Sequence, residues 1–145
     1  PAQDIEVWIG ATAPAAINRT ARLAEGWLGT PSSTPQQAKE QLNQYRQACA
    51  EHQRKPSAVA LRRDIFIGAS VRQAEEFRSH AVAKGYRGFP EDALICGDIS
   101  QVATQFAELF EAGFTDIIVR NMASDQGQAL ATIEALSDVK RQLRL

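Results

Sequence analysis

The stretch from Glu6 to Thr30, EVWIGATAPAAINRTARLAEGWLGT, constrains the fold more than any other part of the chain. Its apolar run at residues 7–9 is long enough for a buried strand and too short for a helix, and it breaks at Gly10. Pro14 suits the first position of a helix, and a second apolar run follows at residues 26–28. This order predicts a βα unit, whose turn leaves backbone N–H groups free to hold a phosphate.

The rest of the chain continues the alternation of strands and helices. The sequence VALRRDIFIG at residues 59–68 predicts a third strand, and FTDIIVR at residues 114–120 predicts a fourth. Helix starts are marked by capping pairs, in which a side chain is followed three residues later by Gln: Thr34 with Gln37, Ser70 with Gln73, Asp98 with Gln101 and Asp125 with Gln128. Four strands that are each followed by a helix predict parallel pairing and right-handed crossovers.

Residues 85–97 interrupt this pattern. Gly88, Pro90 and the acidic pair Glu91-Asp92 predict an insertion that joins two helices of one connection before the last strand. The chain has 145 residues, of which 44% are hydrophobic, so it can bury a substantial core. We therefore expect residues 1–145 to form a single domain.

Charge and composition argue against several classes of partner. The net charge of −1 argues against nucleic acid and polybasic membrane contacts, because both need a clustered positive field. No apolar run approaches the roughly 18 residues of a membrane span. Cys49 and Cys96 lack metal-ligand spacing and predict free thiols in a reducing cytoplasm. His52 and His80 have no ligand at suitable spacing, so we expect surface histidines and no metal site.

Periodicity alone leaves the architecture open, because an open doubly wound sheet and a barrel both alternate strands with helices. The segment VWIGATAPAAINRTARLAEGWL resembles bacterial-luciferase-like flavin monooxygenases, in which a strand ends in two glycines and an Asp-Gly pair opens the next strand. Ala11 replaces the second glycine here, and Glu25 replaces the Asp. The stretches VALRRDIFIG and DALICGDISQVATQFAELFEAGFTDIIVR are similar to the same family, in the same order. The resemblance implies an α/β fold that is the C-terminal half of a (βα)8 TIM barrel.

The resemblance also implies a cofactor site. Members of this family hold the phosphate of a flavin or deazaflavin near such glycines, at the carboxyl ends of the barrel strands. The implied cofactor-binding residues are Gly10, Ala11, Thr12, Ala13, Gly26 and Trp27. The cofactor is then FMN or a deazaflavin. A tight strand-to-helix turn without a ligand is the alternative, because glycine serves turn geometry equally well.

Arg62 and Asp64 on the third strand form a second candidate site. Residues two apart share a face, so these two point one way with Phe66, and Arg63 points the other way. Helices cover the outside of a barrel, so we expect the charged face to look inward, where two charges need each other or a ligand. Alkanesulfonate-type members of the family have an Arg and a His at this spacing in the substrate pocket. Arg62 matches that pattern and Asp64 departs from it, and a structural ion pair is the alternative.

By this resemblance the chain is the C-terminal part of a luciferase-like flavin-dependent monooxygenase or oxidoreductase that acts on a small organic substrate. The sequence identifies no catalytic residue, and the cofactor supplies the redox chemistry in such enzymes. The alternative is a non-catalytic half-barrel that oligomerises and at most binds a phosphorylated ligand. Half a barrel has unpaired strand edges, so we expect a homodimer or a complex with the missing N-terminal half. An open-sheet regulatory domain is a third possibility, which Arg62 and Asp64 disfavour.

Overall fold

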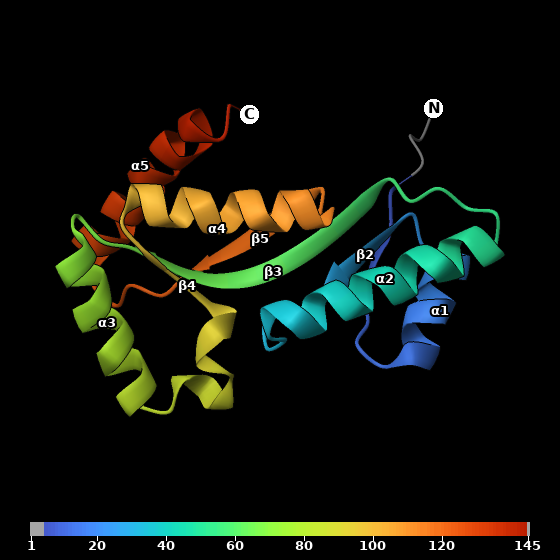
Figure 1. Ribbon diagram of the computed structural model, residues 1–145, viewed down its shortest axis with the longest axis horizontal. Helices are drawn as coiled ribbons and strands as arrows, with labels where there is room; N and C mark the ends of the chain where they lie inside the picture. The colour runs from blue at the N-terminus through green and yellow to red at the C-terminus, as the bar shows by residue number, and fades with distance from the viewer. Residues whose placement is uncertain (1–4, 145) are drawn as a thin grey trace.

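The structure is a computed structural model that describes residues 5–144. The strands of a parallel sheet alternate with helices along the chain (Figure 1). The elements are β1 (Trp8–Gly10), α1 (Pro14–Leu23), β2 (Gly26–Gly29), α2 (Pro35–Glu51), β3 (Ala58–Ile67), α3 (Val71–Ala83), the 3-10 turns η1 (Tyr86–Gly88) and η2 (Glu91–Ala93), β4 (Leu94–Gly97), α4 (Ile99–Ala112), β5 (Asp116–Asn121) and α5 (Gln126–Gln142). Within residues 5–144, no helix has the length and apolar character needed to cross a membrane.

The predicted N-cap residues Thr34, Ser70, Asp98 and Asp125 are confirmed, and the full reciprocal pair is present at α2 and α4. At the start of α2, the Thr34 hydroxyl accepts a hydrogen bond from the Gln37 N–H, and Gln37 Oε1 accepts one from the Thr34 N–H at 3.0 Å. Asp98 and Gln101 form the same reciprocal pair at the start of α4. Such pairs satisfy donors that the first helical turn leaves without backbone partners, so these helices begin where the local sequence dictates.

Strand β3 is the centre of the five-stranded sheet. Its residues 58–61 pair with β2 and its residues 64–67 pair with β4, all in parallel. Its residues 60–65 also pair with β5. Because residues 60–61 pair with both β2 and β5, and residues 64–65 with both β4 and β5, β5 must occupy the opposite edge. One edge of β3 is therefore shared end to end by β2 and β4.

The two faces of the sheet are covered by different helices. A core cluster on one face joins β3 residues Leu61 and Ile65 to helices α1, α2, α4 and α5, and we call this the outer face. The opposite, inner face carries a second cluster in which Phe66 of β3 packs with Ala74 of α3 and with Leu94 of β4. Figure 1 shows α3 and α4 on opposite sides of β3. Helix α3 therefore covers the inner face near the carboxyl end of β3 and does not extend the outer layer.

The segment expected to be an insertion contains a fifth strand. Residues 94–97 are wholly buried and form β4, whereas the sequence predicted only an insertion between two helices. Four residues are too few for periodicity to register, and the turn residues Gly88 and Pro90 immediately before them dominated the sequence pattern. The Arg78 guanidinium of α3 donates to the carbonyls of Leu94 and Cys96, at 3.4 and 3.1 Å, which adds a side-chain tie between α3 and the new strand.

Candidate functional site

The turn that follows β1 lies beside the carboxyl end of β2. Gly10 is in register with Leu28, and the Ala11 N–H donates to the Leu28 carbonyl at 3.4 Å. Thr12 and Ala13 then leave the sheet and are exposed. Ala13 is the N-cap of α1 and has no side chain that can accept a hydrogen bond from the first turn. Pro14 has no N–H and the Ala16 N–H donates to the Ala13 carbonyl at 2.9 Å, so the uncapped first turn of α1 offers a ligand the backbone N–H of Ala15.

A pocket of about 240 Å³ opens at this point. Thr12 and Pro14 form one wall, and Thr30, Ser32 and Ser33 of the loop after β2 form the next. The remaining wall belongs to α2 and carries Gln37, Glu40, Gln41 and Gln44. The lining is therefore rich in hydroxyl and amide groups, which can donate to an anionic or polar ligand.

Several of these groups hold one another in place. The hydroxyls of Thr30 and Ser32 are 3.0 Å apart, and the Ser33 hydroxyl donates to the Thr30 carbonyl at 3.0 Å. Gln41 Oε1 is buried and has no hydrogen-bond partner within residues 5–144. Glu40 is the single carboxylate in the lining and accepts a hydrogen bond from Gln36 Nε2 at 2.7 Å. The loop after β2 is thus held in place by its own hydrogen bonds. The buried Gln41 Oε1 of α2 remains as an acceptor for a ligand.

Gly26 and Trp27, which the sequence grouped with this site, lie at the opposite end of β2. Trp27 is fully buried, stacks on Tyr45 with ring centroids 5.3 Å apart, and donates from Nε1 to the Ala11 carbonyl at 2.9 Å. A Cβ at Gly26 would meet the Trp8 ring at 2.8 Å. Neither residue lines the pocket. Trp27 instead supports the turn from inside the core through its bond to Ala11. The absence of a side chain at Gly26 leaves room for the Trp8 ring beside β2.

The structure separates Arg62 from Asp64. Both lie on the inner face of β3, but Asp64 is 0% exposed and its Oδ2 accepts a hydrogen bond from Arg87 Nη1 at 2.8 Å. Arg62 is half-buried, and within residues 5–144 it forms no ion pair with Asp64. The inward carboxylate is therefore neutralised by a residue of the 85–97 segment, 23 positions along the chain.

Two further buried polar side chains, Arg63 and Tyr86, interact electrostatically with Asp64. Arg63 is 2% exposed, and its Nη1 lies 3.5 Å from the Pro31 carbonyl while its Nη2 has no partner in the described part of the chain. Burial lowers the pKa of Arg63, an effect that the charges of Tyr86, Asp92 and Asp64 oppose. Burial, reinforced by the Asp64 carboxylate, raises the pKa of Tyr86 to about 12. The phenol therefore stays protonated at neutral pH and can act as a hydrogen-bond donor.

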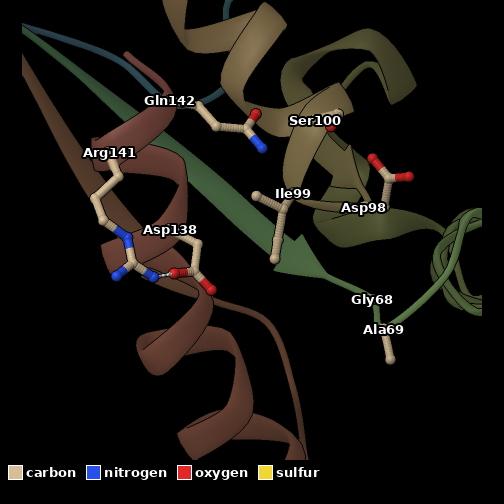
Figure 2. A pocket seen from close by; sticks show the side chains of 8 residues that line it. All are labelled: Gly68, Ala69, Asp98, Ile99, Ser100, Asp138, Arg141 and Gln142. Atoms are coloured by element: carbon tan, nitrogen blue, oxygen red, sulfur yellow. Dashed lines mark ion pairs between the residues drawn. The ribbon is translucent and has the colours of Figure 1, made fainter. Parts of the chain in front are cut away.

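A larger pocket, of about 700 Å³, lies between the start of α4 and the end of α5 beside Gly68 and Ala69 (Figure 2). Its charged groups are matched within the protein. Asp98 accepts from the Gln101 N–H at 2.9 Å, and Arg141 pairs with Asp138. The described chain contains no group of three or more His, Cys, Asp or Glu side chains that could hold a metal ion here or elsewhere. Because its charged groups are already paired, this pocket is a weaker candidate for a ligand site than the hydroxyl-lined pocket.

Sequence reasoning missed part of both polar sites. The hydroxyls of Thr30, Ser32 and Ser33 were visible in the loop sequence TPSST, yet only their position opposite Thr12 makes them a site. The partner of Asp64 had no local signal, because Arg87 reaches it from a turn with a positive φ of 56°.

Comparisons with known proteins agree with this architecture. A family model described as "Luciferase-like monooxygenase" matches residues 1–94. No curated protein sequence matches the chain. Among solved structures, the monooxygenase RslO1 from Streptomyces bottropensis is similar, with a TM-score of 0.76 and 15% identity over 97% of this chain and 48% of that chain.

Two further structures carry bound cofactors. An F420-dependent secondary alcohol dehydrogenase, solved with an F420-acetone adduct, has a TM-score of 0.76 and 13% identity over 100% of this chain and 51% of that chain. The oxygenating constituent of 3,6-diketocamphane monooxygenase from the CAM plasmid of Pseudomonas putida, solved with FMN, has a TM-score of 0.68 and 15% identity over 91% of this chain and 47% of that chain. The chain thus spans about half the length of these structures, which confirms the predicted half-barrel fold and decides against an open doubly wound sheet.

Proposed function

Because the chain belongs to the luciferase-like monooxygenase family, we propose that it is the C-terminal part of a flavin- or deazaflavin-dependent monooxygenase or oxidoreductase. Its part in the enzyme is to hold the phosphate end of the cofactor. The observation that carries this proposal is the pocket in which Thr12, Thr30 and Ser32 converge at the uncapped start of α1. Hydroxyls and helix N-terminal N–H groups together are a common phosphate-binding arrangement.

The residues present fit the phosphate end of such a cofactor. Ligand pockets for whole small molecules span about 300–1,000 Å³, and this one is about 240 Å³. Thr12, Thr30 and Ser32 would donate hydrogen bonds to phosphate oxygens, and the buried Gln41 Oε1 would accept one from a neighbouring hydroxyl of the cofactor chain. When bound, FMN or a deazaflavin supplies the redox chemistry, and the protein orients it and excludes water.

A pair of fluorescence titrations tests the phosphate assignment. We expect FMN to bind the purified chain saturably, and riboflavin, which lacks the phosphate, to bind at least ten-fold more weakly. Thr12→Glu places a like charge in the pocket and should remove this preference. Thr104→Glu, an equal change on the exposed surface of α4, is the matched control and should leave it intact. Equal affinity for FMN and riboflavin in the unmodified chain would refute the assignment.

The part of the inner face that α3 leaves uncovered supports the second candidate function, a half-barrel that oligomerises. Ile118 of β5 lies on this face in register with Arg62 and is 39% exposed, and Trp8 of β1 is also partly exposed. We propose that the missing N-terminal half or a second copy of the chain covers this face and the outer edges of β1 and β5. The free buried thiols of Cys49 and Cys96 support a reducing, cytoplasmic setting.

Light scattering on the purified chain tests this assembly. We expect a dimer, and coexpression with the N-terminal half should convert it into a one-to-one complex. A monodisperse monomer that stays unchanged in the presence of that half would contradict both forms of assembly.

A further inference from the structure

The 85–93 segment and α3 form a further pocket, which is separate from the proposed phosphate site. This pocket measures about 310 Å³. Helix α3 forms one wall, the η1 turn forms another, and Met122 and Ser124 close it from just beyond the carboxyl end of β5. Barrel ligands gather at the carboxyl ends of the strands, which is also where the loop after β2 forms the hydroxyl-lined pocket. The two pockets therefore open at the same end of the sheet.

Its lining divides into an apolar part and a basic part. Phe77, Ala81 and Met122 supply apolar surface and belong to the inner-face core cluster. The basic groups are His80, Lys84 and Arg87. None of the lining side chains is a carboxylate. A ligand that satisfies both parts has an apolar body and a negatively charged end.

Arg87 is held in place for such a contact. Its Nη1 donates to Asp64 Oδ2 at 2.8 Å, and its guanidinium carbon lies 4.6 Å from the centre of the Phe89 ring. The guanidinium of Arg87 has five N–H donors in a fixed planar arrangement. The Asp64 contact uses one edge of this group, and the Phe89 ring covers one face. Its side chain is 36% exposed, so the remaining donors are accessible to a ligand. The contact with Asp64 orients the Arg87 guanidinium in the absence of a ligand.

Tyr86 supplies a second, independent indication. It lines the pocket, is 4% exposed, and its hydroxyl has no hydrogen-bond partner within residues 5–144. A buried hydroxyl without a partner destabilises the folded state, and a hydrogen bond to a ligand oxygen would remove that penalty. The phenol remains protonated at neutral pH, so it would act as a donor to an anion.

We propose that this pocket binds the organic substrate of the enzyme, and that this substrate is a monoanion with an apolar body, of the carboxylate or sulfonate class. Arg87 binds the charged end of the substrate, and Lys84 adds positive charge at the rim of the pocket. Phe77 and Met122 contact the apolar body. Only the identification of this ligand as the substrate rests on the proposed function. The selectivity of the pocket for an anion stands on the lining itself.

Calorimetric titration with octanoate and 1-octanol, in the absence of flavin, tests the inference. We expect octanoate to bind saturably and at least ten-fold more tightly than octanol. Arg87→Gln should weaken octanoate binding about ten-fold and Lys84→Gln about three-fold. Arg72→Gln, which removes an exposed arginine of α3 outside the pocket, is the matched control and should change nothing.

Arg87→Gln also removes the partner of buried Asp64, so a folded comparison is needed. Asp64→Asn/Arg87→Gln removes both charges of the pair, and its circular dichroism should match that of the unmodified chain while octanoate affinity stays about ten-fold reduced. Equal affinity for octanoate and octanol, or unchanged octanoate affinity in this folded double variant, would overturn the proposal. Because no flavin is present, such a result is distinct from a failure of the FMN and riboflavin titrations.

Discussion

The two ends of the sheet differ in the kind of side chain that they bury. Around β1 and β2 the interior carries no charge, and the Trp27 ring lies between Tyr45 and Phe114 with its only polar atom bonded to the Ala11 carbonyl. Around β3 and β4 the interior contains a carboxylate, Asp64, and a guanidinium, Arg63, each with an atom that lacks a partner in the described chain. The buried atoms of the first end that lack a partner within residues 5–144, Tyr45 Oη and Gln41 Oε1, are neutral, whereas these two atoms of the second end belong to charged groups.

This difference shows where each end places its chemistry. Near β1 and β2 the polar groups of the pocket stand at the rim, in the turn with Thr12 and in the loop with Ser32, and the core only positions them. Near β3 and β4 polar groups lie inside, where an unmatched charge is costly. Such an interior is sustained by a ligand, by ordered water or by the other half of a barrel. Specificity is therefore expected at this end and anchoring at the other.

The largest effect should come from removing the apolar support of the first end. Trp27→Ala deletes a fully buried ring and its hydrogen bond to the Ala11 carbonyl, and should lower the free energy of unfolding by about 4 kcal/mol. Urea denaturation followed by circular dichroism measures this loss. Trp8→Ala, which removes a partly exposed ring, is the comparison and should cost about 1 kcal/mol. Equal losses would mean that Trp27 has no special structural role.

The next effect concerns the charged interior of the second end. Asp64→Asn keeps the size of the side chain but removes the charge that faces Arg87, and should cost about 2 kcal/mol in unfolding free energy. Arg87→Gln should cost a similar amount. The double variant should lose about 1 kcal/mol less than the two single losses together, because each single change leaves the other charge without its partner. Strict additivity in urea unfolding would show that the pair is not coupled.

A smaller effect should appear in alkaline solution. Burial raises the pKa of the Cys96 thiol to about 11, from a usual value of 9.0. The folded state thus keeps a proton that the unfolded chain releases, so this stabilisation is complete below pH 9 and disappears as pH rises toward 11. Unfolding free energies measured from pH 8 to 11 should fall by about 1–2 kcal/mol more in the unmodified chain than in Cys96→Ala. Identical slopes would rule out a buried, protonated thiol at this site.

The smallest expected effect lies in the rim of the first pocket. Glu40 is exposed and lines that pocket as its single carboxylate, so it repels a phosphate. Glu40→Gln should tighten FMN binding about two-fold at low salt, since exposed charges interact weakly. Riboflavin affinity should not change, and raising the salt concentration should remove the difference. A weaker FMN affinity in this variant would place the phosphate elsewhere.

Much of the fold could be predicted because its signals are local. The capping pairs, the strand at residues 58–67 and the family segments each lie within one stretch of sequence. The strand β4 could not be predicted, since its four residues follow turn-forming Gly88 and Pro90 and are ordered only by pairing with β3. Helix propensity likewise cannot tell which face of a sheet a helix covers, and α3 lies on the inner face because Phe66 and Phe77 stack there.

The candidate sites were predicted less completely, for reasons of direction and distance. Trp27 follows the end of α1 closely in sequence, but β2 begins there, and the hydroxyl-lined pocket lies beyond the other end of β2, beside Thr30. Arg62 and Asp64 share a face as alternation requires, yet the partner of Asp64 is Arg87, 23 positions away. Long-range pairs of this kind depend on the path of the whole connection, which residue spacing does not encode.

The central position of β3 also determines when the chain can finish folding during synthesis. One edge of β3 is filled by β2 and β4, but its other edge waits for β5, and the Val59 N–H that bonds Thr115 Oγ1 spans 56 positions. Contacts this far apart form late and slow the closure of a sheet. A nascent chain that has not yet reached residue 116 therefore carries its longest strand with one edge open, and this is the interval in which chaperone binding has its greatest influence on the outcome.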